Sequence, residues 1–218
     1  TGWLSGLLLC IQSAFVHAPR CASILALFFA GVIAFAAHPA RPVGAQPHKP
    51  VLAFYYAWYD MTTWQHTPDV PAITYKSTDV QAMARHIDWA RGAGIDGFVV
   101  SWYGPEGGEY NQTQANVLAL LDLAAARGFK IAIDFETRSP FMKTRAKLAD
   151  GLRYAMTVLA AHPAYFRHNG KPVIFSWRND AIAPGEWPAL RAKVDPDRVA
   201  LSIAEGVSTA WLNEFDGL

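Results

Sequence analysis

The sequence predicts an α/β fold of the (β/α)8 barrel type, of which about the first five βα units are present. Short apolar runs alternate with stretches of helical periodicity, an order typical of right-handed βαβ units and a parallel sheet. The expected strands begin at about residues 51, 95, 130, 172 and 198, so one unit averages about 37 residues. Eight such units need about 290 residues and about 170 follow residue 45, so we expect a barrel that is cut off after its fifth unit.

The expected elements follow from local pattern. Apolar runs predict strands, and apolar residues spaced three and four apart predict helices. Thr78 and Asp79 are suited to cap the first helix, and Gly128 is suited to end the second. The expected strands are 51–58, 95–102, 130–136, 172–177 and 198–203, with a sixth opening at 215–218, and the expected helices are 79–91, 116–127, 144–161 and 185–194.

A doubly wound open sheet is the competing fold, and it usually carries a glycine-rich phosphate-binding turn after its first strand. Here the first strand runs into Ala57-Trp58-Tyr59-Asp60, which contains no glycine. Neither GxGxxG nor GxxxxGK[ST] occurs in the sequence. The barrel is therefore the favoured fold.

Residues 1–45 are expected to be a leader, and 46–218 the N-terminal part of the barrel. The uncharged apolar run 21–37 follows Arg20, and Val43 and Ala45 place small residues at the −3 and −1 positions of a cleavage site. This pattern predicts an export signal and a periplasmic or secreted protein. The alternative is an uncleaved membrane anchor, because the run has the minimum length for a span. Both cysteines, Cys10 and Cys21, lie in the leader, so 46–218 has no disulfide.

Composition and motifs exclude several classes of function. The net charge is +1 and no long charge run occurs, so no nucleic-acid partner is indicated, and membrane contact is expected only if the leader stays uncleaved. The histidines form neither HxH nor HExxH, and no serine lies in GxSxG. We therefore expect no metal, no cofactor and no serine nucleophile.

Aromatic and carboxylate residues gather at the expected carboxyl ends of the strands, which converge on one rim in a barrel. Aromatic rings stack on the apolar faces of sugars, and carboxylates bind hydroxyls or act as acid, base or nucleophile. Aromatics are also common in strand cores, but their repetition at three strand ends favours a carbohydrate-binding rim. The candidate substrate-binding residues are Tyr55, Tyr56, Trp58, Tyr59, Trp102, Tyr103, Trp177 and Glu205.

Glu136 is the leading candidate for a catalytic role because it ends an otherwise apolar strand. Asp134 lies two residues earlier and points to the same face. We expect Asp134 to form a buried ion pair with an arginine, while Glu136 faces the ligand. Glu205 is the weaker candidate, since Glu-Gly at a strand end also suits an ordinary turn.

Several short motifs follow one another between Val51 and Leu218. They are FYYAWY at 54–59, GIDGF at 94–98 with SWYG at 101–104, IDFE at 133–136, HPAYFR at 162–167 with KPV at 171–173, and FDG at 215–217. This ordered series resembles the endo-α-mannosidases of glycoside hydrolase family 99 and their bacterial relatives. The resemblance implies a (β/α)8 barrel and a retaining hydrolase that acts inside α-mannoside-containing glycans without a metal. It also implies that Tyr55, Tyr56, Trp102 and Glu136 contact the sugar, with Glu136 as an auxiliary carboxylate.

Two departures from that family are visible. The Glu-Trp-His-Glu type motif that carries its principal carboxylates does not occur here, so the main acid and base are expected beyond Leu218. After Glu136 the family tends to have Pro-Tyr, whereas this chain has Thr137-Arg138. The alternatives are a non-catalytic glycan-binding or surface-assembly barrel, and a hydrolase of another polysaccharide such as an α-glucan.

Overall fold

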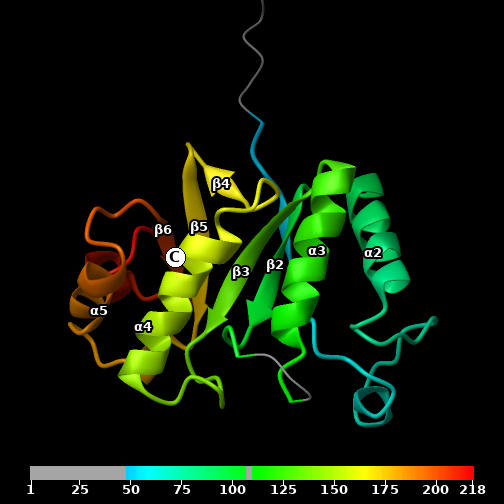
Figure 1. Cartoon of the computed structure of the whole chain (residues 1–218), viewed down its shortest axis with the longest axis horizontal. Coiled ribbons are helices and arrows are strands. Elements are labelled where there is room, and N and C mark those ends of the chain that lie inside the picture. The colour runs from blue at the N-terminus through cyan, green and yellow to red at the C-terminus, as the bar shows by residue number, and fades with distance from the viewer. Residues whose placement is uncertain (1–47, 107–109) are drawn as a thin grey trace, which may run out of the picture. The chain divides into compact units, whose positions relative to one another are not determined.

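Parallel strands form the centre of the fold, in the spatial order β1-β2-β3-β5-β6 (Figure 1). The computed structural model describes residues 48–106 and 110–218, so the predicted leader lies outside the described residues. Lys49–Leu218 is one compact unit. Its parallel strands are β1 (Leu52–Tyr55), β2 (Gly97–Trp102), β3 (Lys130–Glu136), β5 (Lys171–Trp177) and β6 (Leu201–Ala204).

The helices lie along one face of this sheet (Figure 1). They are α2 (Val80–Gly92), α3 (Thr113–Arg127), α4 (Arg145–Tyr154) and α5 (Trp187–Val194), and the π-helical turn η2 (Ala155–Leu159) continues α4. In the described part of the chain, three short 3-10 turns lie in the connections: η1 (Thr63–Gln65), η3 (Asn179–Ala181) and η4 (Thr209–Asn213).

Side chains alternate along each strand, so the sheet has two apolar faces. On β3, Ile131, Ile133 and Phe135 are buried in the large core that the helices cover. Ala132 points the other way and joins a smaller cluster with Val99 and Val173. We call this second side the inner face, since the helices of a (β/α)8 barrel lie outside its strands.

The local signals read from the sequence set most element boundaries. Asp79 caps α2 by accepting a 2.8 Å hydrogen bond from the Gln81 N–H, and Gly128 ends α3 in a left-handed conformation with φ of 63°. Strand β3 has the predicted bounds. Gly97 is the first residue of β2. The position requires glycine because a Cβ atom there would lie 2.7 Å from the carbonyl oxygen of Lys130 on the adjacent strand.

Three local features differ from the sequence-based expectation, and the expected first strand 51–58 also ends early, at Tyr55. The expected helix 144–161 changes to π-helical winding after Tyr154 and ends at Leu159. A short hairpin places β4 (Arg167–His168) antiparallel to β5. The expected sixth strand is present as an isolated parallel bridge between Ile203 and Gly217. Tertiary pairing decides these features, since a two-residue strand has no periodicity of its own.

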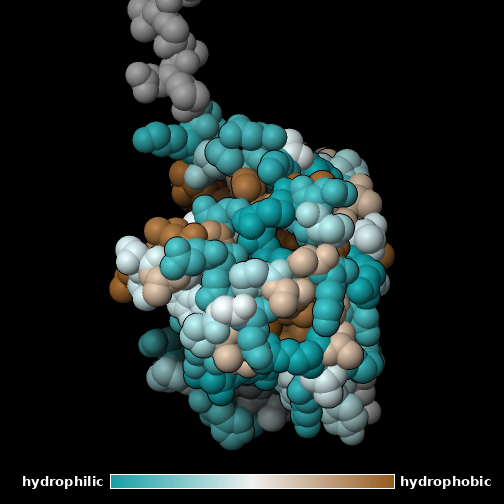
Figure 2. Space-filling view, turned by 90° about the vertical axis from the view of Figure 1, so that its left-hand side faces the viewer, coloured by the Kyte–Doolittle hydropathy of each residue, from teal (hydrophilic) through white to brown (hydrophobic). Residues whose placement is uncertain are grey.

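The molecular surface on the α5 side is mostly hydrophilic, with apolar patches among the polar residues (Figure 2). Val199, Val207 and Leu212 are exposed apolar side chains in the last part of the chain. Among residues 48–106 and 110–218, no helix combines the length and the apolar composition that crossing a membrane requires.

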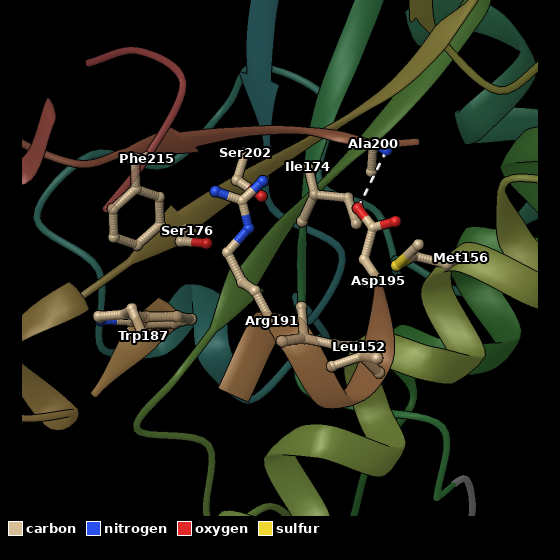
Figure 3. A pocket seen from close by; sticks show the side chains of 11 residues that line it. Leu152, Met156, Ile174, Ser176, Trp187, Arg191, Asp195, Ala200, Ser202 and Phe215 are labelled. Carbon is tan, nitrogen blue, oxygen red and sulfur yellow. Dashed lines mark hydrogen bonds between the residues drawn. The ribbon is translucent and has the colours of Figure 1, made fainter. Parts of the chain in front are cut away.

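A small, partly open cavity lies between α4, α5 and strands β5 and β6 (Figure 3). Its volume is about 20 Å³, which is room for about one water molecule. Arg191 and Asp195 line it, but both are committed to the fold. Arg191 binds Asp216 at 2.9 Å, and Asp195 accepts hydrogen bonds from the N–H groups of Val199 and Ala200. This cavity is part of the packing between helices and sheet, and it is too small for a sugar.

Candidate functional site

Three carboxyl groups gather where the inner face meets the carboxyl ends of β3 and β6. Asp134 and Glu136 lie two residues apart on β3, on the side that also carries Ala132. Glu205 directly follows β6, and its Oε2 atom accepts a 2.7 Å hydrogen bond from the backbone N–H of Arg178. The charges of Glu136 and Glu205 both act on Asp134, so the three groups form one electrostatic cluster.

Burial and the neighbouring charges make Asp134 and Glu136 hold protons more tightly than free carboxyl groups do. Burial, followed by the charges of Glu136 and Glu205, raises the pKa of Asp134 to about 7. Burial also raises the pKa of Glu136, while the hydrogen bond from Ser101 opposes that rise and the charge of Glu205 adds to it. A carboxyl group that exchanges its proton near neutral pH has the property required of a general acid or base.

The prediction that Asp134 forms a buried ion pair with an arginine is wrong. Among the residues that the structure describes, no arginine forms an ion pair with Asp134, and the arginines of the nearest βα loops pair with Asp180 instead. An ion pair would lower the pKa of Asp134, whereas burial beside two acidic neighbours raises it. Asp134 therefore belongs to the candidate site together with Glu136.

Aromatic side chains lie beside this cluster. Trp58 contacts both Tyr56, with ring centroids 4.8 Å apart, and Tyr103, with ring centroids 5.6 Å apart. Burial and then the charge of Glu136 raise the pKa of Tyr103, which places that phenol near the carboxylates. Tyr56 is 45% exposed. These rings offer apolar faces next to acidic groups, an arrangement suited to sugars.

Tyr59 continues the aromatic group away from the carboxylates. Its ring stacks on Trp64 with centroids 4.2 Å apart and lies 6.0 Å from the ring of Trp58. Two side chains of the α3 region hold the preceding loop in place: Asn116 donates to the carbonyl of Ala57, and Gln112 donates to the carbonyl of Trp58. The loop after β1 is thus fixed by buried polar contacts, which its apolar sequence did not reveal.

Tyr55 and Trp102 do not lie on the rim, contrary to expectation. Trp102 is fully buried on the helix-covered face, where its indole N–H donates a 2.8 Å hydrogen bond to Gln114. Tyr55 is 8% exposed, stacks on Phe98 and bonds to the His86 ring through its hydroxyl at 3.0 Å. The reason is alternation: neighbouring residues on a strand face opposite ways, so β1 and β2 direct Tyr55 and Trp102 to the helices.

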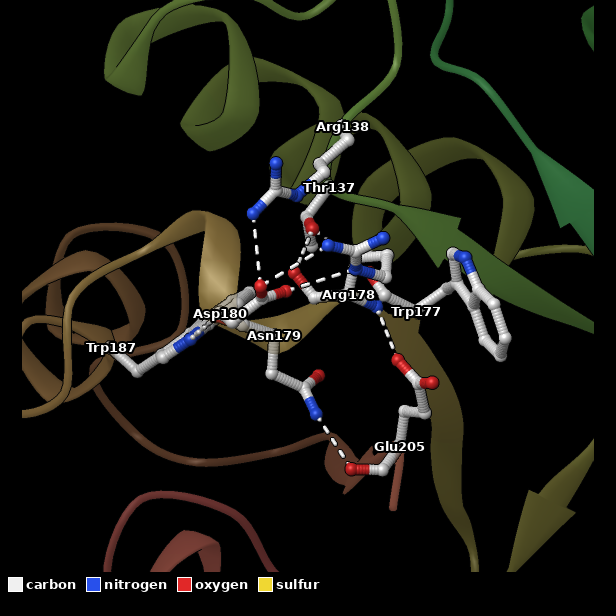
Figure 4. Close-up of polar contacts among 8 residues, drawn as sticks. All are labelled: Thr137, Arg138, Trp177, Arg178, Asn179, Asp180, Trp187 and Glu205. Carbon is white, nitrogen blue, oxygen red and sulfur yellow. Dashed lines mark hydrogen bonds and ion pairs between the residues drawn. The ribbon is translucent and has the colours of Figure 1, made fainter.

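Trp177 and Glu205 lie at the carboxyl ends of the neighbouring strands β5 and β6 (Figure 4). Trp177 is 44% exposed and is paired in register with Glu136 of the neighbouring strand, so both side chains emerge on the inner face. The next residue, Arg178, has a φ of 57°, a left-handed conformation that non-glycine residues seldom adopt. Its backbone N–H turns toward Glu205, and this contact joins the two strand ends.

Three polar residues of the site were not among the candidate site residues predicted from the sequence. Ser101, fully buried on β2, donates a hydrogen bond to Oε1 of Glu136. Thr137 donates toward the carbonyl oxygens of Trp177 and Arg178. Asn179 donates a 3.0 Å hydrogen bond to the Glu205 carbonyl. Counting alternate positions back from Tyr103 would have placed Ser101 on the inner face, but nothing local marks Thr137 or Asn179.

No group of three or more histidine, cysteine, aspartate or glutamate side chains suited to a metal ion occurs within residues 48–106 and 110–218. Asp134, Glu136 and Glu205 form a cluster of carboxyl groups beside aromatic rings, and the pKa values of Asp134 and Glu136 are raised. Such an arrangement can bind sugar hydroxyls and transfer protons.

Comparison with known proteins identifies the family. Residues 65–212, more than half of the 218-residue chain, match the model of glycosyl hydrolase family 99. The chain belongs to glycosyl hydrolase family 99. The family expected from the ordered motifs is therefore confirmed.

Relatives in this family include enzymes from animals and bacteria. The chain is 21% identical over 146 residues to the glycoprotein endo-alpha-1,2-mannosidase of Rattus norvegicus, a match that covers 65% of this chain and 32% of that protein. A solved GH99 endo-alpha-mannosidase from Bacteroides thetaiotaomicron, in complex with BIS-TRIS-propane, superposes with a TM-score of 0.62 at 24% identity. That comparison covers 77% of this chain and 57% of the solved one.

A second structure of the B. thetaiotaomicron enzyme gives a TM-score of 0.59 at 25% identity, covering 75% of this chain and 57% of that one. The chain therefore spans about a third of the rat relative and little more than half of the bacterial one. These family 99 structures are TIM barrels, and the parallel strands found here form part of such a barrel. The predicted fold class is thus confirmed.

Proposed function

We propose that the protein is an exported glycoside hydrolase that cleaves internal α-mannosidic linkages with retention of the anomeric configuration. The observation that carries this proposal is the cluster of Asp134, Glu136 and Glu205 beside Tyr103 and Trp177, at the carboxyl ends of the strands of a family 99 chain. The rat and B. thetaiotaomicron relatives are endo-α-mannosidases, which supports the choice of α-mannosides.

Each group has a role that its surroundings allow. The half-exposed Tyr56 and Trp177 rings stack on sugar faces, and Tyr103 orients a hydroxyl near Glu136. Glu136, held by Ser101, accepts hydrogen bonds from sugar hydroxyls as an auxiliary carboxylate. The principal acid and base are not assigned to residues of this chain. Export is proposed from the leader pattern at 1–45, and the substrate from the family.

The test uses the full-length protein and a panel of α-mannoside and α-glucan oligosaccharides. The expected result is release of a new reducing end from an internal α-mannosidic bond, with the first-formed anomer matching the configuration of the substrate by NMR. Release from α-glucans alone would assign the protein to another polysaccharide. Binding of mannosides without any release would indicate a non-catalytic glycan-binding barrel.

A further inference from the structure

A cationic hollow adjoins the carboxylate site on the outer side of the rim. Its volume is about 620 Å³, within the range of small-molecule sites. It is lined by residues of the loop that follows β3, of the first turn of α4 and of η3. Three cationic side chains line it, Arg138, Lys143 and Arg145, against one carboxylate, Asp180.

The cations in the hollow retain free hydrogen-bond donors. Arg138 uses one terminal nitrogen to bind Asp180 at 2.9 Å, and Arg145 uses one terminal nitrogen to bind Glu186. A guanidinium group has five N–H donors, so most of those on each arginine remain available. Within the described part of the chain, Lys143 has no ion-pair partner. The hollow therefore presents unsatisfied positive groups to solvent.

The ion pairs that exist there are weak enough to be rearranged. The side chains of Arg138, Arg145 and Asp180 are each about half exposed, and exposed ion pairs contribute little net stability. Asp180 is shared, because Arg178 binds it through two nitrogens at 3.1 and 3.3 Å. Figure 4 shows the guanidinium groups of Arg138 and Arg178 converging on Asp180. Asp180 can keep Arg178 as its partner when Arg138 turns to an incoming anion.

The backbone around the hollow is held firmly and is connected to the carboxylate site. Thr137, directly after Glu136, is buried and donates a 2.8 Å hydrogen bond to the carbonyl of Trp177. Ser139 is buried and donates a 2.6 Å hydrogen bond to the carbonyl of Tyr103. Arg138 therefore lies on a fixed loop, between two residues that are hydrogen-bonded to the backbone carbonyls of Trp177 and Tyr103. A glycan that contacts Glu136 has the hollow beside it.

We propose that this hollow binds an anionic group, a phosphate or a carboxylate, on a sugar residue of the glycan that occupies the neighbouring carboxylate site. The inference rests on the proposed function, because it names the substrate class of the same site. Arginine and lysine side chains are well suited to phosphate and carboxylate oxygens. The acidic cluster of Asp134, Glu136 and Glu205 repels an anion, so the charged sugar is directed to the outer side of the rim.

The experiment compares the full-length wild-type protein with the double variant Arg138→Gln/Lys143→Gln. Binding is measured by calorimetry with a neutral α-mannoside oligosaccharide, the same oligosaccharide bearing one 6-phosphate, and one bearing a uronic acid residue. The wild type should bind at least one anionic form more tightly than the neutral form, and the double variant should lose that gain, about 10- to 100-fold in Kd. Neutral oligosaccharide should bind both proteins alike.

Matched controls keep the result specific. The variant Arg91→Gln/Lys193→Gln removes two exposed cations from the ends of α2 and α5 and should leave every affinity unchanged. Asp180→Asn frees Arg138 and should strengthen binding of the anionic sugar. Inorganic phosphate is the remaining probe, and it should bind more weakly than the phosphorylated oligosaccharide.

Each result has one meaning. Equal affinity for neutral and anionic oligosaccharides, or a preference that survives Arg138→Gln/Lys143→Gln, overturns the inference. Inorganic phosphate that binds as tightly as the phosphorylated sugar also overturns it, since the hollow would then be a simple anion site. Arg138-dependent binding of anionic sugars without hydrolysis of any mannoside would support the inference and reject the proposed hydrolase. Hydrolysis of neutral mannosides without any preference for anionic sugars would support the proposed hydrolase and reject the inference.

Discussion

The hydroxyl of Ser101 on β2 donates a hydrogen bond to the carboxylate of Glu136 on β3. Both side chains are buried on the inner face of the sheet, so the contact crosses from one strand to its neighbour away from bulk water. It stabilises the charged form of Glu136 against the burial that raises its pKa. The ionisation of Glu136 therefore depends on the hydroxyl of Ser101, the first residue of the SWYG motif.

Ser101→Ala should raise the pKa of Glu136 because it removes the group that opposes the effect of burial. If activity requires ionised Glu136, the acidic limb of the profile of kcat/KM against pH moves to higher pH in the full-length enzyme. Ser101→Thr, which keeps the hydroxyl, is the control and should retain the wild-type limb. An unchanged limb in Ser101→Ala would show that Glu136 ionisation does not govern activity.

Glu136→Gln should lower kcat/KM on α-mannosides about 10- to 100-fold, since it removes the charge that strengthens hydrogen bonds to sugar hydroxyls. Thermal stability should stay the same or rise, because the pKa of Glu136 shows that burial disfavours its charge. Asp197→Asn, an exposed carboxylate before β6, is the control for a change of charge alone. Wild-type turnover in Glu136→Gln would remove this residue from the site.

Asp134→Asn should stabilise the protein at pH 8 by on the order of 1 kcal/mol or more. The folded-state pKa of Asp134 is raised to about 7, whereas an unfolded aspartate has a pKa of about 4. Between these values the folded state binds more protons, so stability falls as pH rises through this range. Melting temperatures at pH 4 and pH 8 measure the effect. The gain should be present at pH 8 and small at pH 4, and a gain of equal size at both would contradict the assignment.

Tyr55, the last residue of β1, and Tyr56, which follows it, form a matched pair with opposite expected effects. Tyr55→Phe breaks the hydrogen bond to His86 and should cost about 1 kcal/mol of stability with little change in KM. Tyr56→Ala removes a half-exposed ring beside Trp58 and should raise KM with little loss of stability. Denaturant unfolding and steady-state kinetics on both variants separate the two roles. A larger effect of Tyr55→Phe than of Tyr56→Ala on KM would reverse the assigned faces.

Residues 46–218 expressed alone should be poorly soluble. Strands β1 and β6 lie at the ends of the parallel sheet, and inner-face side chains such as Phe54 and Trp177 are about half exposed. Size-exclusion chromatography and calorimetry measure the outcome. A monomeric product that melts cooperatively would show that this part of the barrel needs no further cover.

The sequence by itself was sufficient for the fold class and the family. Apolar runs and helical periods alternate strongly enough to define parallel βα units, and caps such as Asp79 and Gly128 act locally, so they are visible without a structure. Glu136 was also predicted as a site residue from the sequence, because a carboxylate at the end of an apolar strand is costly to bury and therefore indicates a functional role.

Only the tertiary structure decided which side chains meet. The sequence places Tyr55, Tyr56 and Trp102 at strand ends, but the register between strands directs only Tyr56 of these three away from the helix-covered core. Asp134 has acidic neighbours, although an arginine was expected beside it. One of these neighbours, Glu205, follows a strand about 70 residues later in the chain. A contact between residues so far apart in sequence leaves no local pattern that could predict it. Local propensity determines where helices and strands form, whereas long-range strand pairing determines the environment of each carboxylate.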